Sequence, residues 1–208
     1  MKLFRIFAIA ALAMVSSVSA QAGFVLSNMG SNGLDAAYSS SSNITGTKIG
    51  GSGFTVGASD FFLNSINVAT VGNGVITATI VDAVGNNPGT NVFTSATKSV
   101  IGGDQIVTFN FNDFQLQAGE SYFVTLNSTL TNPAWYVKTS SPSVIPPGGL
   151  TFLASRYSED NGVSWDSSLG VFQIAYNGST VPPAVPEPAL TSLLCLSGIA
   201  LIRRRMKK

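Results

Sequence analysis

The chain has 208 residues, of which 45% are hydrophobic and only 10% are charged, and its formal net charge is +1. It contains no histidine, the commonest general base and metal ligand, and its single cysteine excludes an intramolecular disulfide and a cysteine-based zinc cluster. The length suits one ordinary domain with targeting segments at its ends.

Residues 1–22 are predicted to be a secretory signal peptide. Two cations precede a ten-residue apolar run at 6–15, and small residues follow it. Ala20 and Ala22 fit the A-x-A pattern of signal peptidase cleavage, and 18–20 is a second choice. Because a membrane span needs about 20 apolar residues, we expect this segment to be removed rather than kept as an anchor.

The body at 23–180 is predicted to be one all-β domain, a jelly-roll-like β-sandwich. Polar and apolar residues alternate, no useful stretch keeps a helical period, and clusters of Gly, Asn and Pro separate the alternating segments. Loops are expected at 39–42 and 139–147. About nine or ten short strands are predicted, near 24–28, 47–56, 62–71, 75–82, 91–100, 105–111, 121–127, 134–138, 150–157 and 171–177.

The body is acidic once the two ends are set aside. Four lysine or arginine residues and nine aspartate or glutamate residues lie between 23 and 185, which gives a net charge of −5. Since phosphate contacts dominate binding to nucleic acids, an acidic body without a basic patch argues against a nucleic-acid partner.

A series of short motifs spreads over this body. They are FTVG at 54–57, FL at 62–63, ITATI at 76–80, NPGT at 87–90 and AGESYFV at 118–124. Together they resemble the bacterial surface domain called choice-of-anchor R, over roughly 45–178. The resemblance implies a secreted β-sandwich without an established activity.

Residues 158–165 (SEDNGVSW) have the form S-x-D-x-G-x-[ST]-W, which is similar to the Asp-box hairpin of sialidases and many other β-proteins. We interpret the motif as structural: the Asp side chain accepts backbone hydrogen bonds, Gly supplies a positive φ, and Trp packs beneath the turn. The residues with these roles are Ser158, Asp160, Gly162, Ser164 and Trp165.

The same segment has an alternative interpretation, a calcium or sugar site built from Glu159, Asp160 and Asp166. Hard cations take six to eight oxygen ligands, and this cluster offers few. The structural interpretation is therefore preferred, and no metal site is predicted.

Aromatic and acidic side chains offer two further candidate sites. Trp135, Tyr136 and Trp165 would form a platform on which sugars stack, or else they belong to the core or its rim, which general burial tendencies favour. Glu120 and Glu159 are the candidate carboxylate pair for glycoside hydrolysis, although turn positions explain both. We therefore predict no catalytic residue and no cofactor.

The C-terminal end is predicted to be a second targeting signal. A Pro-rich linker at 181–188 leads into a hydrophobic helix and basic tail at 189–208, with fourteen uncharged residues followed by a cluster containing five cations. Fourteen helical residues span about 21 Å, less than a hydrocarbon core of roughly 30 Å. This predicts a marginal membrane anchor with a cytoplasmic C-terminus; the alternative is a buried core helix with a basic tail.

The order of features in this tail resembles the PEP-CTERM sorting domain of Gram-negative bacteria. The features are Pro186, Glu187 and Pro188, then the apolar helix, then Arg203, Arg204 and Arg205. The resemblance covers 185–208 and implies cleavage by an exosortase near the tripeptide. It also implies an inner-membrane intermediate, followed by delivery to the cell surface or the extracellular matrix. Cys195, within the helix, departs from the pattern and has no assigned role.

Three function classes follow from these patterns. The first is an exported, non-enzymatic protein of the cell surface or extracellular matrix, with signal peptidase and an exosortase as processing partners. The second is a carbohydrate-binding module for exopolysaccharide. The third is an enzyme that cleaves glycans with acidic residues.

Overall fold

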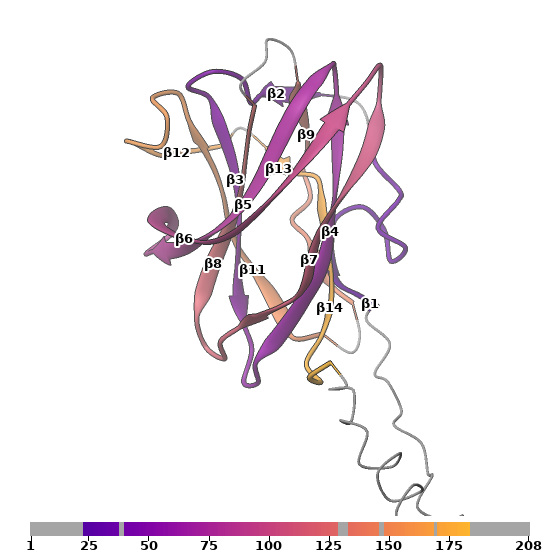
Figure 1. Ribbon diagram of the computed structural model, residues 1–208, viewed down its shortest axis with the longest axis vertical. Helices are drawn as coiled ribbons and strands as arrows, with labels where there is room; N and C mark the ends of the chain where they lie inside the picture. The colour runs from indigo at the N-terminus through magenta and orange to yellow at the C-terminus, as the bar shows by residue number, and fades with distance from the viewer. Residues whose placement is uncertain (1–22, 38–39, 129–132, 146–147, 169, 184–208) are drawn as a thin grey trace, which may run out of the picture. The chain divides into compact units, whose positions relative to one another are not determined.

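The computed structural model describes residues 23–37, 40–128, 133–145, 148–168 and 170–183 (Figure 1). The body, Ala20–Pro182, forms one compact unit. Both predicted targeting segments lie outside the described residues, including the cleavage positions, the Pro-Glu-Pro tripeptide, the arginine cluster and Cys195. Within the described part of the chain, no helix is long and apolar enough to cross a membrane.

The described residues form strands and turns and contain no helix, which confirms the all-β prediction. The strands assigned in these ranges are β1 (Gly23–Ser27), β2 (Ser41–Asn43), β3 (Ile49–Val56), β4 (Phe61–Val71), β5 (Gly74–Val84), β6 (Asn87–Val100), β7 (Gln105–Leu116), β8 (Ser121–Ser128), β9 (Ala134–Lys138), β10 (Ser143–Val144), β11 (Leu150–Ser158), β12 (Asp166–Ser167), β13 (Val171–Phe172) and β14 (Ile174–Ser179).

Two sheets with antiparallel ladders make up the body (Figure 1). One sheet has the order β10-β1-β14-β4-β9-β13, with β2 paired to β9 and β7 paired to β4. The other has the order β12-β11-β3-β8-β5-β6. Among the described strands, β6 pairs only with β5 and β7 only with β4, so both are edge strands. They follow one another in the chain but belong to different sheets, and the turn between them therefore joins the two layers.

Aromatic side chains from both sheets fill the space between the layers. Phe54 on β3 meets Tyr176 on β14 with ring centroids 4.8 Å apart, and the Tyr176 hydroxyl donates to the backbone oxygen of Ser52 at 3.2 Å. Trp135 on β9 stacks on Phe172 on β13 at 4.3 Å. All four rings are fully buried, so the two sheets pack face to face around one core.

Strand β3 carries three glycines because aromatic rings lie against its backbone on both faces. A Cβ added to Gly50 would lie 2.8 Å from Cζ of Phe172 and 2.9 Å from Cε3 of Trp135. A Cβ added to Gly53 would lie 2.6 Å from Cζ of Phe123. Since successive strand residues point to opposite faces, Gly50 makes room for the rings on the core side of β3, and Gly53 makes room for the ring on its outer side.

Several boundaries differ from the sequence prediction. The segment expected to be a loop at 39–42 contributes to β2, and the loop expected at 139–147 contains β10. Both strands are two or three residues long, which is too short for an alternating pattern to show. β6 also starts at Asn87, four residues before the predicted start at 91, because the presumed Asn-Pro-Gly turn still pairs with β5.

The strand predicted at 171–177 is two strands, β13 and β14, separated at Gln173. Gln173 is fully buried, and its side chain makes hydrogen bonds of 2.6 Å with both the N–H and the carbonyl of Ala37. Phe172 pairs with β9, whereas Ile174 pairs with β4. The buried amide therefore marks the point where the chain changes its partner strand, which alternation alone does not reveal.

Candidate functional site

The hairpin at 158–165 follows β11, and the carboxylate of Asp160 holds it together. Its Oδ1 accepts hydrogen bonds from Oγ of Ser158 at 2.8 Å and from N of Ser164 at 2.9 Å, while its Oδ2 accepts from Oγ of Ser164 at 2.6 Å. These donors, first of all the Ser164 hydroxyl, lower the pKa of Asp160 to about 2. Asn161 and Gly162 adopt positive φ angles of 61° and 84°.

The hairpin is also fastened to strand β3 and the residues before it. The N–H of Asn161 donates to the carbonyl of Thr47 at 2.7 Å. The half-buried indole of Trp165 lies against two glycines: a Cβ on Gly51 would be 3.5 Å from the ring, and one on Gly162 would be 3.6 Å from it. The arrangement is that of a turn stabilised by its own side chains and by packing on the sheet.

The acidic residues of this hairpin do not converge on one point. Glu159 pairs with Lys48 at 3.3 Å, while the oxygens of Asp160 accept hydrogen bonds from within the turn. Asp166 is exposed at the start of β12. Across the described ranges, no group of three His, Cys, Asp or Glu residues is placed to hold a metal ion.

The two glutamates considered for glycoside hydrolysis lie at opposite ends of β3. The carbonyl of Glu120 accepts from N of Val56, the last residue of β3, at 2.9 Å. Glu159 pairs with Lys48, which directly precedes β3. Eight strand residues extend about 23 Å, whereas the two carboxyl groups of glycosidases are about 5–9.5 Å apart. The structure does not bring this pair together.

The hypothesis of a sugar platform at Trp135, Tyr136 and Trp165 is wrong, and the core alternative is correct for its first two members. Trp135 is fully buried, and its Nε1 donates to the carbonyl of Gln173 at 2.8 Å. Tyr136 is buried too, and its hydroxyl donates to a carboxylate oxygen of Asp104. Neither ring presents a free face to a ligand.

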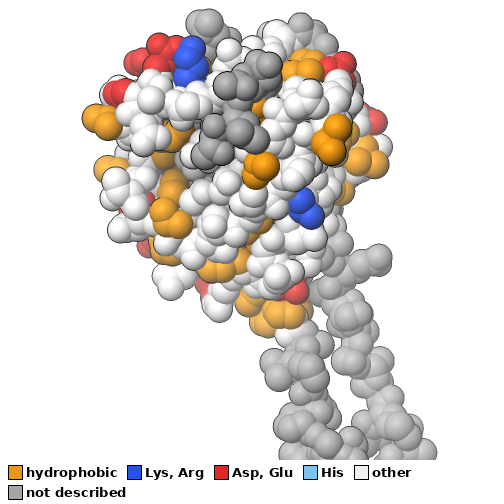
Figure 2. Space-filling view, turned by 45° about the horizontal axis from the view of Figure 1, so that its top comes forward, with side chains coloured by type: hydrophobic (Ala, Val, Ile, Leu, Met, Phe, Trp, Pro, Cys, Tyr) orange, Lys and Arg blue, Asp and Glu red, His pale blue; other side chains and the backbone are white. Residues whose placement is uncertain are grey.

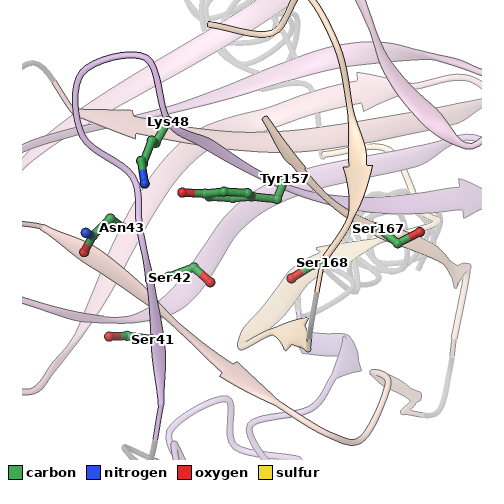
Figure 3. Close-up of a pocket in the computed structure, with 7 residues that line it drawn as sticks. All are labelled: Ser41, Ser42, Asn43, Lys48, Tyr157, Ser167 and Ser168. Atoms are coloured by element: carbon green, nitrogen blue, oxygen red, sulfur yellow. The ribbon is translucent and has the colours of Figure 1, made fainter. Parts of the chain in front are cut away.

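One pocket that the sequence analysis missed is lined by hydroxyl groups and has a volume of about 230 Å³ (Figure 3). Its residues come from β2, β11, β12 and neighbouring loops: Ser41, Ser42, Asn43, Lys48, Tyr157, Ser167 and Ser168. In Figure 3 the Tyr157 hydroxyl points toward the Lys48 ammonium. The hydrogen bond with Glu159 is the main cause that raises the pKa of Lys48. Lys48 is paired with Glu159 at 3.3 Å, and the other lining residues are uncharged, so the pocket is a polar hollow.

A second pocket, which we call the aromatic groove, has a volume of about 320 Å³. It lies where β5, β6 and β8 of one sheet meet β7 of the other. Its residues are Asp82, Ala83, Phe93, Phe114, Gln115, Gln117, Glu120, Ser121 and Tyr122. Of these residues, only Glu120 was predicted from the sequence as a candidate site residue. The available signal was Phe93, an aromatic residue that lies next to Val92 in a stretch of strand rich in Asn, Thr and Ser.

No protein-family model matches this chain, and no curated protein matches it at a significant level. The resemblances to the PEP-CTERM tail and to the choice-of-anchor R domain therefore stay predictions that rest on the quoted motifs.

Proposed function

We propose that this chain is an exported, non-enzymatic protein of the cell surface or extracellular matrix, with a jelly-roll-like β-sandwich body. In this proposal signal peptidase cuts after Ala22, the C-terminal helix holds an inner-membrane intermediate, and an exosortase then cleaves near Pro186-Glu187-Pro188. The observation that carries the proposal is the ordered tail, in which the tripeptide, an uncharged fourteen-residue run and a cationic cluster follow one another.

Features of the body support the non-enzymatic part of the proposal. Its core is drawn from residues between Val25 and Tyr176 and needs no disulfide. Charged side chains are few on the face shown in Figure 2, where uncharged surface predominates. The absence of histidine from the whole sequence and the separation of Glu120 from Glu159 support a non-enzymatic role.

The proposal is tested by the mass of the mature protein. The gene is expressed in a Gram-negative host with an exosortase, and protein extracted from the surface is measured by intact-mass spectrometry. We expect a chain that begins near Gly23 and lacks Arg203 and all that follows it. Mature protein that still ends in Lys208 would overturn the proposal.

A matched pair of variants separates sorting from general damage to the linker. Replacing Glu187 by Ala is expected to leave the tail uncut and the protein in the inner membrane. Replacing Pro182 by Ala changes the same linker outside the tripeptide, and cleavage should continue. If both variants are cut equally, the tripeptide is not the recognition element.

The alternative function, a carbohydrate-binding module for exopolysaccharide, is favoured by one specific feature. The aromatic groove combines a half-exposed phenylalanine with carboxylate and amide groups, which are the side chains that recognise sugars.

A further inference from the structure

We infer that the aromatic groove is a binding site for neutral sugars, in which the Phe93 ring supports the apolar face of one sugar unit and polar side chains around it bind the hydroxyl groups. The inference deepens the carbohydrate-binding alternative. It depends on the proposed export only for its biological setting.

Phe93 is aimed into the groove by a β-bulge. Thr94 pairs with Ile80 and Val92 pairs with Val81, so Phe93 is the extra residue between two consecutive pairs. A bulge redirects the side chain of the inserted residue, and bulges occur often beside binding sites. Here the ring turns toward the opposite sheet, where its centroid lies 6.5 Å from that of Phe114.

Asp82 stabilises the segment that leads into this bulge. Its carboxylate accepts from the backbone N of Asn91 at 3.0 Å and from Nδ2 of the same residue at 2.7 Å. Gly89 allows this approach, because a Cβ there would collide with the Asp82 carboxylate. The curl of β6 before Phe93, visible in Figure 1, is thus held in place before any ligand arrives.

The ring of Phe93 contacts other aromatic rings and remains partly exposed. Its edge contact with Tyr122 has a centroid distance of 5.5 Å and an interplanar angle of 70°, and Tyr122 in turn stacks on Phe54 in the core at 6.0 Å. Phe93 nevertheless keeps 47% of its surface exposed. A half-exposed aromatic ring fixed by core rings is a platform with low entropic cost of binding.

Polar groups around the ring are arranged to exchange hydrogen bonds with hydroxyls. Nε2 of Gln115 donates to Asp60 at 2.7 Å, which leaves the Gln115 amide oxygen as an acceptor. The Tyr122 hydroxyl accepts from N of Gln117 at 3.1 Å and keeps its proton for donation. Glu120 is exposed and adds a carboxylate, the strongest acceptor for a hydroxyl donor.

The charge of the groove selects neutral ligands. Two carboxylates, those of Asp82 and Glu120, line it, and its lining residues include no lysine or arginine. Together with the net charge of −5 between 23 and 185, this disfavours uronic-acid, sulfated and phosphorylated polymers. The volume of about 320 Å³ lies at the lower end of the range for ligand pockets, which suits one or two sugar units.

The test titrates the full-length protein, purified in a detergent without a sugar headgroup, with neutral and acidic oligosaccharides. The probes are gluco-oligosaccharides, N-acetylated chito-oligosaccharides and oligogalacturonate, and binding is measured by isothermal titration calorimetry. We expect saturable binding of at least one neutral probe and weaker binding of oligogalacturonate. Absence of binding to every neutral probe, or preference for the acidic one, would overturn the inference.

Matched variants place the binding site. Phe93→Ala should weaken binding by at least about tenfold, because it removes the stacking surface. Val92→Ala changes the adjacent exposed residue, which is 64% exposed, and should leave affinity unchanged. Glu120→Gln, an isosteric change on an exposed turn that spares the core, should also weaken binding by about tenfold. Equal affinity of wild type, Phe93→Ala and Glu120→Gln would refute the site.

Two further measurements distinguish sugar binding in the groove from glycan cleavage there and from the proposed sorting of the chain. Reducing ends released by wild type and not by Glu120→Gln would make the groove a catalytic site and overturn the binding-only assignment. Export and tail cleavage are measured separately by mass. The sugar titration can therefore fail while the proposed sorting is confirmed, and the reverse.

Discussion

The substitution Gly50→Ala in strand β3 tests how tightly the core is packed. The added methyl group would lie 2.8 Å from Phe172 and 2.9 Å from Trp135, closer than carbon atoms approach in proteins. Neither ring can move away easily, because both are fully buried and stack on one another at 4.3 Å. The backbone of β3 must then shift, or the ring pair must separate.

Two opposing effects decide the magnitude. Overpacking a core costs about 1–3 kcal/mol, while replacing Gly by Ala restricts the unfolded chain and stabilises by about 0.4–1 kcal/mol. Because the contacts involve rigid buried rings, the steric cost is larger, and we expect a net loss of about 1–2 kcal/mol. For a body of this size the melting temperature should fall by about 2–8 °C.

The assay is urea unfolding followed by tryptophan fluorescence, with the midpoint compared at a constant m-value. Gly103→Ala is the control, because a Cβ there meets no atom within 4 Å and the residue has no positive φ. Its stability should stay within about 0.5 kcal/mol of wild type. Phe172→Leu, combined with Gly50→Ala, should destabilise less than the two single changes add up to. A Gly50→Ala variant as stable as wild type, or strict additivity with Phe172→Leu, would refute the packing argument.

Two other predictions concern the hairpin and the autonomy of the body. The pKa of Asp160 is lowered from 3.8 to about 2, so its contribution to stability is complete above pH 4 and is lost as the pH falls through 2. Asp160→Ala should therefore lower the melting temperature at pH 7 and remove this part of the acid dependence, whereas the control Asp166→Ala should retain it. Identical pH profiles of wild type and Asp160→Ala would contradict the assignment. The fragment 23–183 should fold alone as a monomer with the circular dichroism of a β-protein, since Ala20–Pro182 is one compact unit. An unfolded fragment would show that the core needs the terminal segments.

The alternation of polar and apolar residues predicted the longer strands, because every second residue of such a strand faces the core. In β8, Tyr122, Val124 and Leu126 are all buried, as their spacing of two requires. The same rule could not show where a strand changes partners, because Gln173 interrupts the pattern through a contact with Ala37, which is 136 residues away. Register and partner choice depend on such long-range contacts, which a local pattern does not contain.

The candidate sites also divide into those built from local contacts, which the sequence predicted, and those built from distant segments, which it did not. The Asp160 turn was predictable because its hydrogen bonds join residues within four positions of one another. The aromatic groove was not, because Asp82, Phe93 and Glu120 come from three separate segments that only the fold brings together. General burial tendencies favoured a core position for Trp135, which is confirmed, but composition alone could not exclude the platform because it does not say which aromatic rings are buried.

The irregular edges of the two sheets bear on whether copies of the chain aggregate through their strands. An unpaired strand edge is a template for another copy of the chain, and proteins blunt such edges by keeping them short or by interrupting them. Here β10, β12 and β13 have two residues each, while β7 is interrupted at Asn112 and Asp113, which have positive φ angles. The long strand β6 has register shifts at Phe93 and at the curl before it. One bulge therefore both aims an aromatic ring and makes the edge of the longest strand a poor template for pairing with another copy of the chain.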